Sequence, residues 1–338
     1  MNNILGSSGV ATILTAVIAF ALTASLGIFL VPYLKKLKYG QTIKEIGPTW
    51  HQAKQGTPTM GGIMFIIGII VAVIVGYITA WIAFDYRADQ VQTVKLAAGV
   101  VLALGFGLMG YIDDYIKVVK KRNLGLRARE KLIIQFFLTV GYLFILTMAG
   151  AVSTIVEIPF FGQVNFGWFY YPFMVVLIIG FVNAVNLTDG VDGLASSVTF
   201  VFALAFMVYT MKLSLPYLGL FAVATAAGCL GFLMWNFHPA KVFMGDTGSM
   251  FLGGCVVALA FGLDMPLLLF IAGIIYWCEA GSVILQVISF KTTGKRIFKM
   301  SPIHHHFEMS GWSEVKIVTV FSLVTLIFCV IGYFALPM

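Results

Sequence analysis

The sequence has few charged residues. Asp, Glu, Lys and Arg make up only 10% of its 338 residues, hydrophobic residues make up 60%, and the mean hydropathy is +0.98. A soluble domain usually carries about 25% charged residues, so this composition excludes an ordinary soluble protein. It predicts an all-α polytopic membrane protein that forms a single integral membrane domain over residues 1–338.

Cysteines and acidic residues are also scarce. The cysteines lie in apolar runs without CxxC spacing, which excludes a disulfide framework or a zinc site and predicts packed thiols. They are Cys229, Cys255, Cys278 and Cys329. The N-terminus lacks a basic stretch followed by a cleavage site, so we expect no cleavable signal peptide. The 14 acidic and 21 basic residues give a net charge of +7, which basic membrane loops explain without a nucleic-acid partner.

Long hydrophobic runs account for most of the chain. With about 20 apolar residues per span, the sequence predicts ten transmembrane helices, no soluble domain and no internal repeat. They are placed at Val10–Leu34, Gly61–Phe84, Val94–Tyr111, Leu132–Ala149, Tyr171–Val185, Leu194–Met211, Pro216–Trp235, Ser249–Leu263, Met265–Phe290 and Ile317–Leu336. Only Asp264 separates the eighth run from the ninth.

Basic residues are unevenly divided between the two sides of these spans. All of the 21 except Arg87, Lys95 and Lys212 fall on one side. The positive-inside rule makes that side cytoplasmic, and both termini then face outward. The segment Val152–Phe169 alternates β-branched and aromatic residues and contains no Lys or Arg, which predicts a short external β-hairpin.

The densest polar motif interrupts two apolar runs between Asn183 and Gly193. It contains Asn186, Asp189 and Asp192. Such groups at the edge of a membrane indicate a wet site enclosed by protein, although a polar turn between two helices is the plainer alternative. Every dense polar motif falls on the predicted cytoplasmic side, so we expect one cytoplasmic active-site cleft.

Two adjacent carboxylates, Asp113 and Asp114, end the third span, and Lys117 follows three residues later. Neighbouring residues of a helix point about 100° apart, so the two carboxylates should have different tasks. One could hold a metal ion while the other handles a proton or orients a ligand. Mg²⁺ favours one or two carboxylates together with substrate phosphates. Helix capping beside a basic loop is the alternative.

A second acidic motif lies in the loop between Asn236 and Ser249. Asp246 stands between two glycines just before an apolar run. A residue of this kind can be a helix N-cap, but a helix N-terminus also favours anions, so the position suits a metal-bound diphosphate. Phe243 could stack on a base or simply pack.

Three consecutive histidines, His304, His305 and His306, precede the last span. Side chains diverge along either a helix or a strand, so three in a row cannot all face one ion, and the spacing does not indicate a zinc site. Their basic neighbours suit phosphate or sugar contacts, and a solvated loop is the alternative.

Polar residues also flank or interrupt other apolar runs. Thr57 can cap a helix that begins with Pro58, while Lys54 and Thr59 could contact anions. Glu279 and Gln286 lie on one face of the ninth span and favour a packed polar network.

One glycine pattern fits a cofactor motif by chance. The segment Gly105–Gly110 matches GxGxxG, but it lies inside a predicted span and follows no strand. Close packing of helices through small residues explains it.

Four motifs, in this order, resemble the bacterial phospho-N-acetylmuramoyl-pentapeptide transferases of the polyprenyl-phosphate N-acetylhexosamine-1-phosphate transferase superfamily. They are Gly110–Lys117, Asn183–Ala195, Phe243–Ser249 and Ser301–Glu308. The resemblance covers nearly the whole chain, including its length, its ten spans and the motif order. The Pro-Ile-His-His-His-Phe-Glu run favours this branch over relatives that transfer N-acetylglucosamine phosphate.

The resemblance implies a transferase of the bacterial cytoplasmic membrane. It would move phospho-N-acetylmuramoyl-pentapeptide from its UDP conjugate to undecaprenyl phosphate and release UMP, with Mg²⁺ as cofactor. Asp113 would deprotonate the lipid phosphate, with Asp114 beside it. Asp246 would hold Mg²⁺ together with Asp113, or act as nucleophile in a two-step route. A homodimer and inhibition by nucleoside antibiotics are further implications. A transporter, with polar groups reaching both faces, and a structural scaffold are the alternatives.

The resemblance also implies substrate contacts. Asn186, Asp189 and Asp192 would frame the uridine diphosphate, with Phe243 against the uracil. The remaining implied residues are Lys54, Thr59, Lys117 and Lys131 for the phosphates, His304, His305 and His306 for the sugar-phosphate side, Gln286 near them, and Asn236.

Overall fold

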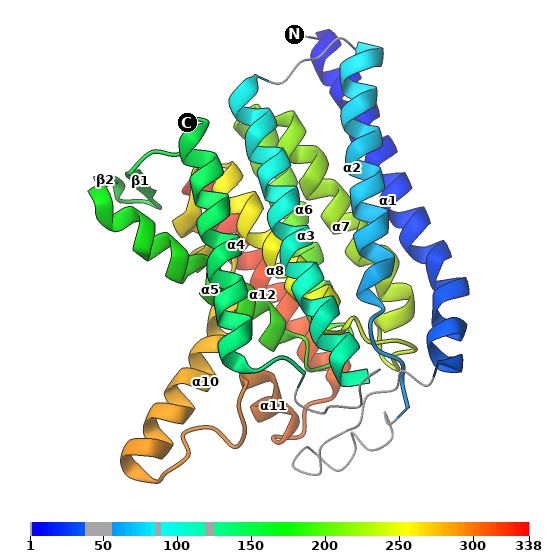
Figure 1. Cartoon of the computed structure of the whole chain (residues 1–338), viewed down its shortest axis with the longest axis vertical. Helices are drawn as coiled ribbons and strands as arrows, with labels where there is room; N and C mark the ends of the chain where they lie inside the picture. The colour runs from blue at the N-terminus through cyan, green and yellow to red at the C-terminus, as the bar shows by residue number, and fades with distance from the viewer. Residues whose placement is uncertain (1, 38–55, 85–88, 119–124, 338) are drawn as a thin grey trace.

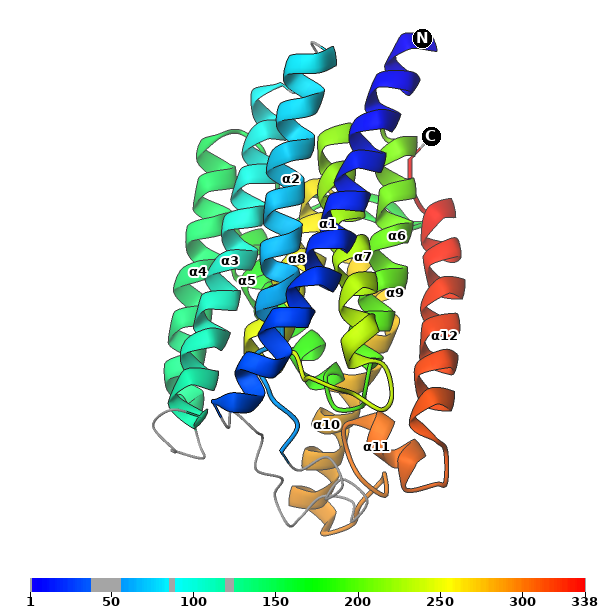
Figure 2. The same ribbon diagram turned by 90° about the vertical axis from the view of Figure 1, so that its right-hand side faces the viewer.

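The computed structural model describes residues 2–37, 56–84, 89–118 and 125–337. In this part of the chain ten helices are long and apolar enough to cross a membrane, which confirms the predicted polytopic all-α class. The helices lie side by side in one bundle, and the two ends of the chain lie at the same end of it (Figures 1 and 2).

The secondary structure follows the apolar runs closely. The ten long helices are α1 (Asn2–Lys36), α2 (Gly62–Phe84), α3 (Gln90–Val118), α4 (Ala128–Met148), α5 (Tyr170–Thr188), α6 (Leu194–Lys212), α7 (Pro216–Asn236), α8 (Gly245–Gly262), α10 (Ile274–Thr293) and α12 (Glu314–Phe334). The shorter elements are the 3₁₀ segments η2 (Gly167–Phe169) and η3 (Pro266–Leu268), the helices α9 (Leu269–Ala272) and α11 (Ile303–Glu308), and strands β1 (Ile155–Ile158) and β2 (Gly162–Asn165).

The ninth predicted span is not one continuous helix. The structure divides it into η3, α9 and α10, with a break at Gly273. The backbone at Gly273 is packed closely, since a Cβ there would lie 3.1 Å from the ring of Phe181. Beyond the break α10 diverges from the other helices (Figure 1), and apolar side chains such as Ile284 and Phe290 are exposed on it.

Helix α8 is the core of the bundle, because 89% of its span is buried, more than in any other candidate span. Small residues bring it close to α3. A Cβ on Gly110 would overlap the carbonyl oxygen of Asp246, and a Cβ on Gly254 would lie 2.5 Å from the Cα of Ala103. The structure therefore supports the small-residue packing predicted for Gly105–Gly110, and it places the end of α3 against the start of α8.

The predicted hairpin is also confirmed. Strands β1 and β2 pair antiparallel, with Val156 opposite Val164. Phe160 in the turn and Gly162 at the start of β2 both have positive φ. The hairpin lies in the same half of the bundle as the chain termini (Figure 1).

The prediction of packed thiols is correct for three of the four cysteines. Cys229, Cys255 and Cys329 are buried, but Cys278 is exposed because it lies on α10. All four thiols are free.

Candidate active site

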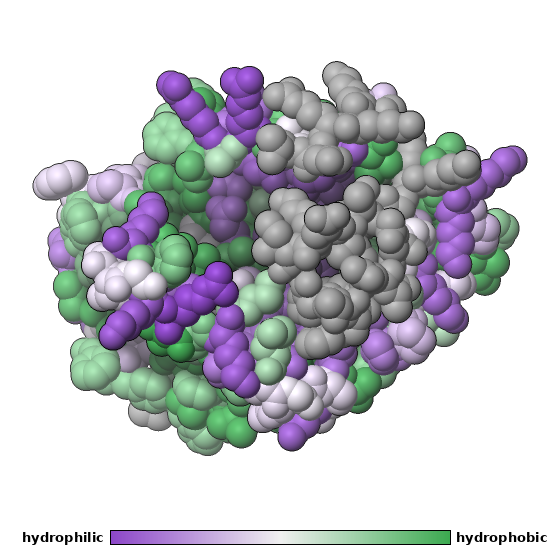
Figure 3. Space-filling model, turned by 90° about the horizontal axis from the view of Figure 1, so that it is seen from below, coloured by the Kyte–Doolittle hydropathy of each residue, from purple (hydrophilic) through white to green (hydrophobic). Residues whose placement is uncertain are grey.

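The candidate site lies at the end of the bundle opposite the chain termini, where hydrophilic side chains gather (Figure 3). The end of α3 meets the start of α8 here. Asp113 and Asp114 of α3 and Asp246 of α8 each contribute an oxygen to a group whose members lie within 4.8 Å of one another. We call these three carboxylates, together with Lys117 and Lys131, the carboxylate–lysine centre.

Asp246 is held through both of its oxygens. Its Oδ2 accepts hydrogen bonds from Lys117 Nζ at 2.9 Å and from Lys131 Nζ at 2.8 Å. Its Oδ1 accepts a hydrogen bond from Asn186 Nδ2 at 3.1 Å, and that amide also donates to Ser249 Oγ at 2.7 Å. Four helices, α3, α4, α5 and α8, therefore converge on one carboxylate.

Asp113 shares the same two lysines. Its Oδ2 lies 2.6 Å from Lys117 Nζ and 3.0 Å from Lys131 Nζ, and its Oδ1 accepts the backbone N–H of Leu126 at 2.7 Å. The side chain is fully buried. A buried carboxylate needs a partner of opposite charge, and each ammonium here bridges Asp113 and Asp246.

Asp114 has a different environment from its neighbour, as expected for adjacent residues on a helix. Its oxygens accept the backbone N–H of Asp246 at 3.2 Å, the backbone N–H of Thr247 at 2.9 Å and Thr247 Oγ1 at 2.7 Å. Asp114 thus satisfies donors in the first turn of α8, which would otherwise lack intrahelical partners. Its carboxylate joins α3 to α8.

Thr59 lies beside this junction and is buried. A Cβ on Gly245 would overlap Asp114 Oδ2 and would lie 2.8 Å from Thr59 Oγ1. Lys54 lies outside the described residues. The prediction that Thr57 caps a helix beginning at Pro58 is wrong, because α2 begins at Gly62.

Phe243 belongs to the same junction. Its backbone N–H donates to the carbonyl of Pro58 at 2.8 Å, and its carbonyl accepts the N–H of Gly61 at 2.8 Å. These bonds fix the segment Pro58–Gly61, which precedes α2, to the loop before α8. The Phe243 side chain is half-buried.

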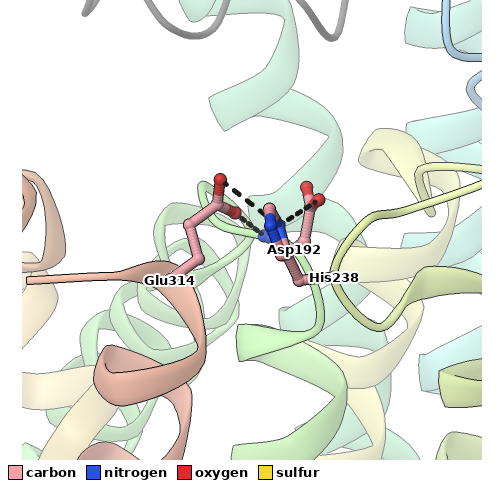
Figure 4. A group of neighbouring side chains, drawn as sticks. All are labelled: Asp192, His238 and Glu314. Carbon is pink, nitrogen blue, oxygen red and sulfur yellow. Dashed lines mark hydrogen bonds and ion pairs between the residues drawn. The ribbon is translucent and has the colours of Figure 1, made fainter.

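Asp192 belongs to a separate group, the Asp192–His238–Glu314 cluster. His238 Nδ1 lies 3.2 Å from Asp192 Oδ2 and 3.6 Å from Glu314 Oε1 (Figure 4). Asp192 Oδ2 also accepts the N–H of Ala240 at 3.0 Å, and the N–H of Asp192 donates to Glu314 Oε2 at 3.0 Å. The three residues could offer ligand atoms to a metal ion.

Asn236 connects two of the loops at this end of the bundle. It is buried, its Oδ1 accepts the N–H of Gly193 at 3.1 Å, and its Nδ2 donates to the carbonyl of Val242 at 2.9 Å. These bonds fix the loop after Asp192 to the loop before α8.

Asp189 is influenced by carboxylates of both groups. Burial, followed by the negative charges of Asp246, Asp114 and Asp192, raises the pKa of Asp189 to about 8. Its side chain is half-buried between α5 and α6. It is therefore largely protonated at neutral pH.

The three histidines face three different partners. His304 is buried, with Nδ1 3.0 Å from Glu279 Oε2, and its ring packs against Gly190 so closely that a Cβ there would overlap it. His305 Nδ1 lies 2.5 Å from Glu308 Oε2. His306 Nδ1 accepts the N–H of Lys299 at 3.2 Å. This divergence agrees with the expectation that they do not share one ion.

The side-chain amide of Gln286 forms hydrogen bonds with backbone groups of the segment that follows α10. Its Nε2 donates to the carbonyl of Phe298 at 3.0 Å, and its Oε1 accepts the N–H groups of Ile297 at 3.0 Å and Phe298 at 2.9 Å. The segment that follows α10 is held in place by this single amide.

Sequence reasoning did not identify His238, Glu314 or Gln135 as part of this region. The first two lie in a loop and at a helix start on the basic side, so their position was a signal that could have been used. Gln135 lies inside an apolar run and gave no such signal.

Several known proteins with similar sequences carry one family name. Residues 96–264 match the family model for glycosyl transferase family 4, and residues 54–66 match phospho-N-acetylmuramoyl-pentapeptide-transferase signature 1. A phospho-N-acetylmuramoyl-pentapeptide-transferase of Acetivibrio thermocellus is 46% identical over 324 residues, which cover 95% of this chain and 94% of the relative.

Two further relatives carry the same name. The one from Clostridium botulinum (strain Alaska E43 / Type E3) is 46% identical over 329 residues, with 96% of this chain and 97% of the relative covered. The one from Halalkalibacterium halodurans is 44% identical over 324 residues, with 95% and 96% covered. At this identity over nearly the full length, the chain belongs to the phospho-N-acetylmuramoyl-pentapeptide transferase family.

Proposed function

We propose that this protein transfers phospho-N-acetylmuramoyl-pentapeptide from its UDP conjugate to undecaprenyl phosphate at the carboxylate–lysine centre. The products are UMP and the first lipid-linked intermediate of peptidoglycan. One observation carries this assignment to the site: Lys117 and Lys131 each bridge Asp113 and Asp246 at one end of the spans. A lipid phosphate and a soluble nucleotide can meet at that end, and phosphoryl transfer depends mainly on positioning and charge neutralisation.

In the proposed reaction Asp113 accepts the proton of the lipid phosphate. The freed oxygen attacks the sugar-linked phosphorus of the donor. The bond from that phosphorus to the bridging oxygen breaks, and UMP leaves with the electron pair. Lys117 and Lys131 neutralise the phosphate oxygens during this step. We prefer direct attack to an aspartyl-phosphate on Asp246, because a lipid phosphate that has lost its proton is a sufficient nucleophile.

We propose that the carboxylate–lysine centre binds a magnesium ion, since its three carboxylates could offer ligand atoms to a metal. Asp113 and Asp246 supply the carboxylate oxygens that Mg²⁺ prefers, while Asp114 uses its oxygens on α8. We propose Asp113 and Asp246 as the ligands. When bound, the ion would neutralise negative charge on the diphosphate.

For the donor, we propose that Asn186, Asp189 and Asp192 frame the uridine diphosphate and that Phe243 lies against the uracil. His305 and His306, which are half-buried, are proposed for the sugar-phosphate side, and Lys54 and Thr59 for the phosphates. The remaining predicted residues, Asn236, His304 and Gln286, bind protein groups, and we propose that they support the site.

The whole chain would act as one transferase domain in the bacterial cytoplasmic membrane. The excess of basic residues on the active-site side favours a cytoplasmic site and external termini. From the family we also propose a homodimer, and competition between nucleoside antibiotics and the nucleotide donor.

The deciding experiment measures UMP release by the purified protein. Both substrates are supplied with and without Mg²⁺, and one reaction omits undecaprenyl phosphate. We expect release only when donor, lipid and metal are all present. Release with UDP-N-acetylglucosamine in place of the muramoyl donor would favour the related branch. A phosphorylated Asp246 trapped without lipid would overturn direct attack.

A further inference from the structure

We propose that Gln135 and Asn183 are positioning residues, which together form an amide clasp that holds α4 and α5 in register at the active site. The inference rests on the proposed function of the carboxylate–lysine centre. It assigns a role to two polar side chains that do not contact Asp246 themselves.

The clasp is a reciprocal pair of hydrogen bonds. Gln135 Nε2 donates to Asn183 Oδ1 at 3.2 Å, and Asn183 Nδ2 donates to Gln135 Oε1 at 2.9 Å. Asn183 Nδ2 also donates to the carbonyl of Ile179 at 2.8 Å within α5. Gln135 is fully buried. Both amides thus satisfy one another in apolar surroundings, where a lost partner is costly.

The position of the clasp links it to Asp246. Lys131 lies four residues before Gln135 on α4, and Asn186 lies three residues after Asn183 on α5, so each lies about one helical turn from the clasp. Lys131 Nζ contacts Asp246 Oδ2 at 2.8 Å, and Asn186 Nδ2 contacts Asp246 Oδ1 at 3.1 Å. The two clasped helices therefore supply the groups that hold the two different oxygens of one carboxylate.

The clasp fixes helix register because its bonds are short and directional. A slide of α4 along α5 by one residue, about 1.5 Å, would break both amide bonds and would move Lys131 relative to Asn186. A misplacement of about 1 Å can cost about 10²-fold in rate. We expect clasp variants to lower kcat much more than they raise KM for the donor.

The first test replaces each amide by an apolar side chain of similar size. Gln135→Leu and Asn183→Leu should each lower kcat for UMP release by about ten- to a hundredfold, and KM for donor and lipid should stay within about threefold. The double variant should resemble the single variants, because either change breaks the same pair. Thr139→Val is the matched control, since Thr139 is buried one turn further along α4 and its hydroxyl has no hydrogen-bond partner among the described residues.

A second test separates positioning from general packing. The effect of Asn183→Leu is measured again in an Asn186→Ala background, by single-turnover reaction with excess enzyme. If Asn183 acts through Asn186, Asn183→Leu should lower the single-turnover rate much less in this background than in the otherwise unaltered protein. If the rate losses of the two substitutions multiply instead, the proposal is overturned. If the leucine variants do not accumulate, Gln135→Glu retains an acceptor for Asn183 Nδ2, and its carboxyl, kept protonated by burial, can also donate to Asn183 Oδ1. This variant should therefore keep a kcat much nearer to that of the unaltered protein, and a loss as large as that of Gln135→Leu would overturn the proposal.

Failure of the clasp can be distinguished from failure of the site. Full activity in Asp246→Asn would refute the proposed function of the carboxylate–lysine centre. Loss of activity in Asp246→Asn, together with clasp variants that behave like Thr139→Val, would overturn only the clasp.

Discussion

The two acidic groups at the active-site end of the bundle have similar ligand atoms but are contacted by different kinds of hydrogen-bond donor. In the carboxylate–lysine centre, two ammonium groups lie between Asp113 and Asp246. In the Asp192–His238–Glu314 cluster, the two carboxylates contact the imidazole of His238 and accept hydrogen bonds from backbone N–H groups. Lysine ammonium groups can turn to phosphate oxygens, whereas backbone donors cannot move without changing the fold.

The two groups also differ in what holds them. The carboxylate–lysine centre is built on helix ends that glycine contacts bring together, with Gly110 against Asp246. The cluster joins the loop after α5, the loop after α7 and the first residue of α12. Sites on rigid elements position groups more accurately than sites on loops. We therefore expect the centre to govern turnover and the cluster to govern loop order and donor affinity.

The sharpest way to break this comparison is to remove one negative charge from each group. Asp246→Asn should lower UMP release by about 10³-fold, because it removes the carboxylate on which two lysines and one amide converge. Glu314→Gln should lower it by less than about tenfold and act mainly on KM for the donor. Equal losses of kcat in the two variants would refute the division of roles.

The glycine contact beneath the centre gives the next largest effect. Gly110→Ala should lower both turnover and the free energy of unfolding, the latter by about 3 kcal/mol, because its Cβ would overlap the Asp246 carbonyl and overpacking of this kind is costly. Gly141→Ala on α4 is the control, since a Cβ there has open space. It should be neutral or slightly stabilising. Thermal unfolding in detergent and UMP release are measured for both.

Within the centre, we expect substitution of Asp114 to lower mainly the stability of the protein and substitution of Asp113 to lower mainly the rate of transfer. Asp114→Asn should lower the free energy of unfolding by about 2 kcal/mol, since an amide has only one acceptor atom for the donors of Asp246 and Thr247. Asp113→Asn should abolish transfer with a smaller change in melting temperature, because Lys117 and Lys131 keep Asp246 as a partner. The reverse ranking of melting temperatures would contradict these roles.

Asp189 is affected by the negative charges of both groups. Its substitution should give the smallest change in stability. Its pKa of about 8 in the folded protein exceeds its ordinary value of 3.8, so the folded state binds more protons than the unfolded state between those values. The contribution of Asp189 to stability should therefore fall as the pH rises from about 4 to about 8. Asp189→Asn should flatten this fall by up to about 1 kcal/mol, since the half-exposed side chain is partly screened by solvent. Melting temperatures at about pH 6 and pH 8 in a chelator would measure it, and identical slopes would exclude the effect.

Much of the fold follows from local sequence. An apolar run of about 20 residues has few alternatives to a helix in a membrane, and each predicted span except the ninth corresponds to one helix. The break in the ninth lies at Gly273, where the backbone is packed so closely that a Cβ would lie 3.1 Å from the ring of Phe181. Hydrophobicity alone does not mark this position, although Pro266 and Gly273 are residues that commonly interrupt helices.

The sequence by itself determined the class of the protein, its spans and the set of polar residues available for chemistry. The sequence identified Asp113, Asp114, Asp246 and the nearby lysines as candidates. Charged residues at a membrane boundary are costly to desolvate, so they often mark a functional site. Tertiary structure alone decided how these residues divide the work. In the structure Asp114 accepts hydrogen bonds from the start of α8, Asp113 contacts two lysines, and Asp192 contacts His238. Gln135 forms hydrogen bonds with Asn183. The physical reason is that hydrogen bonds and ion pairs between helices depend on helix rotation and register, which the contact of glycines on α3 with α8 helps to fix.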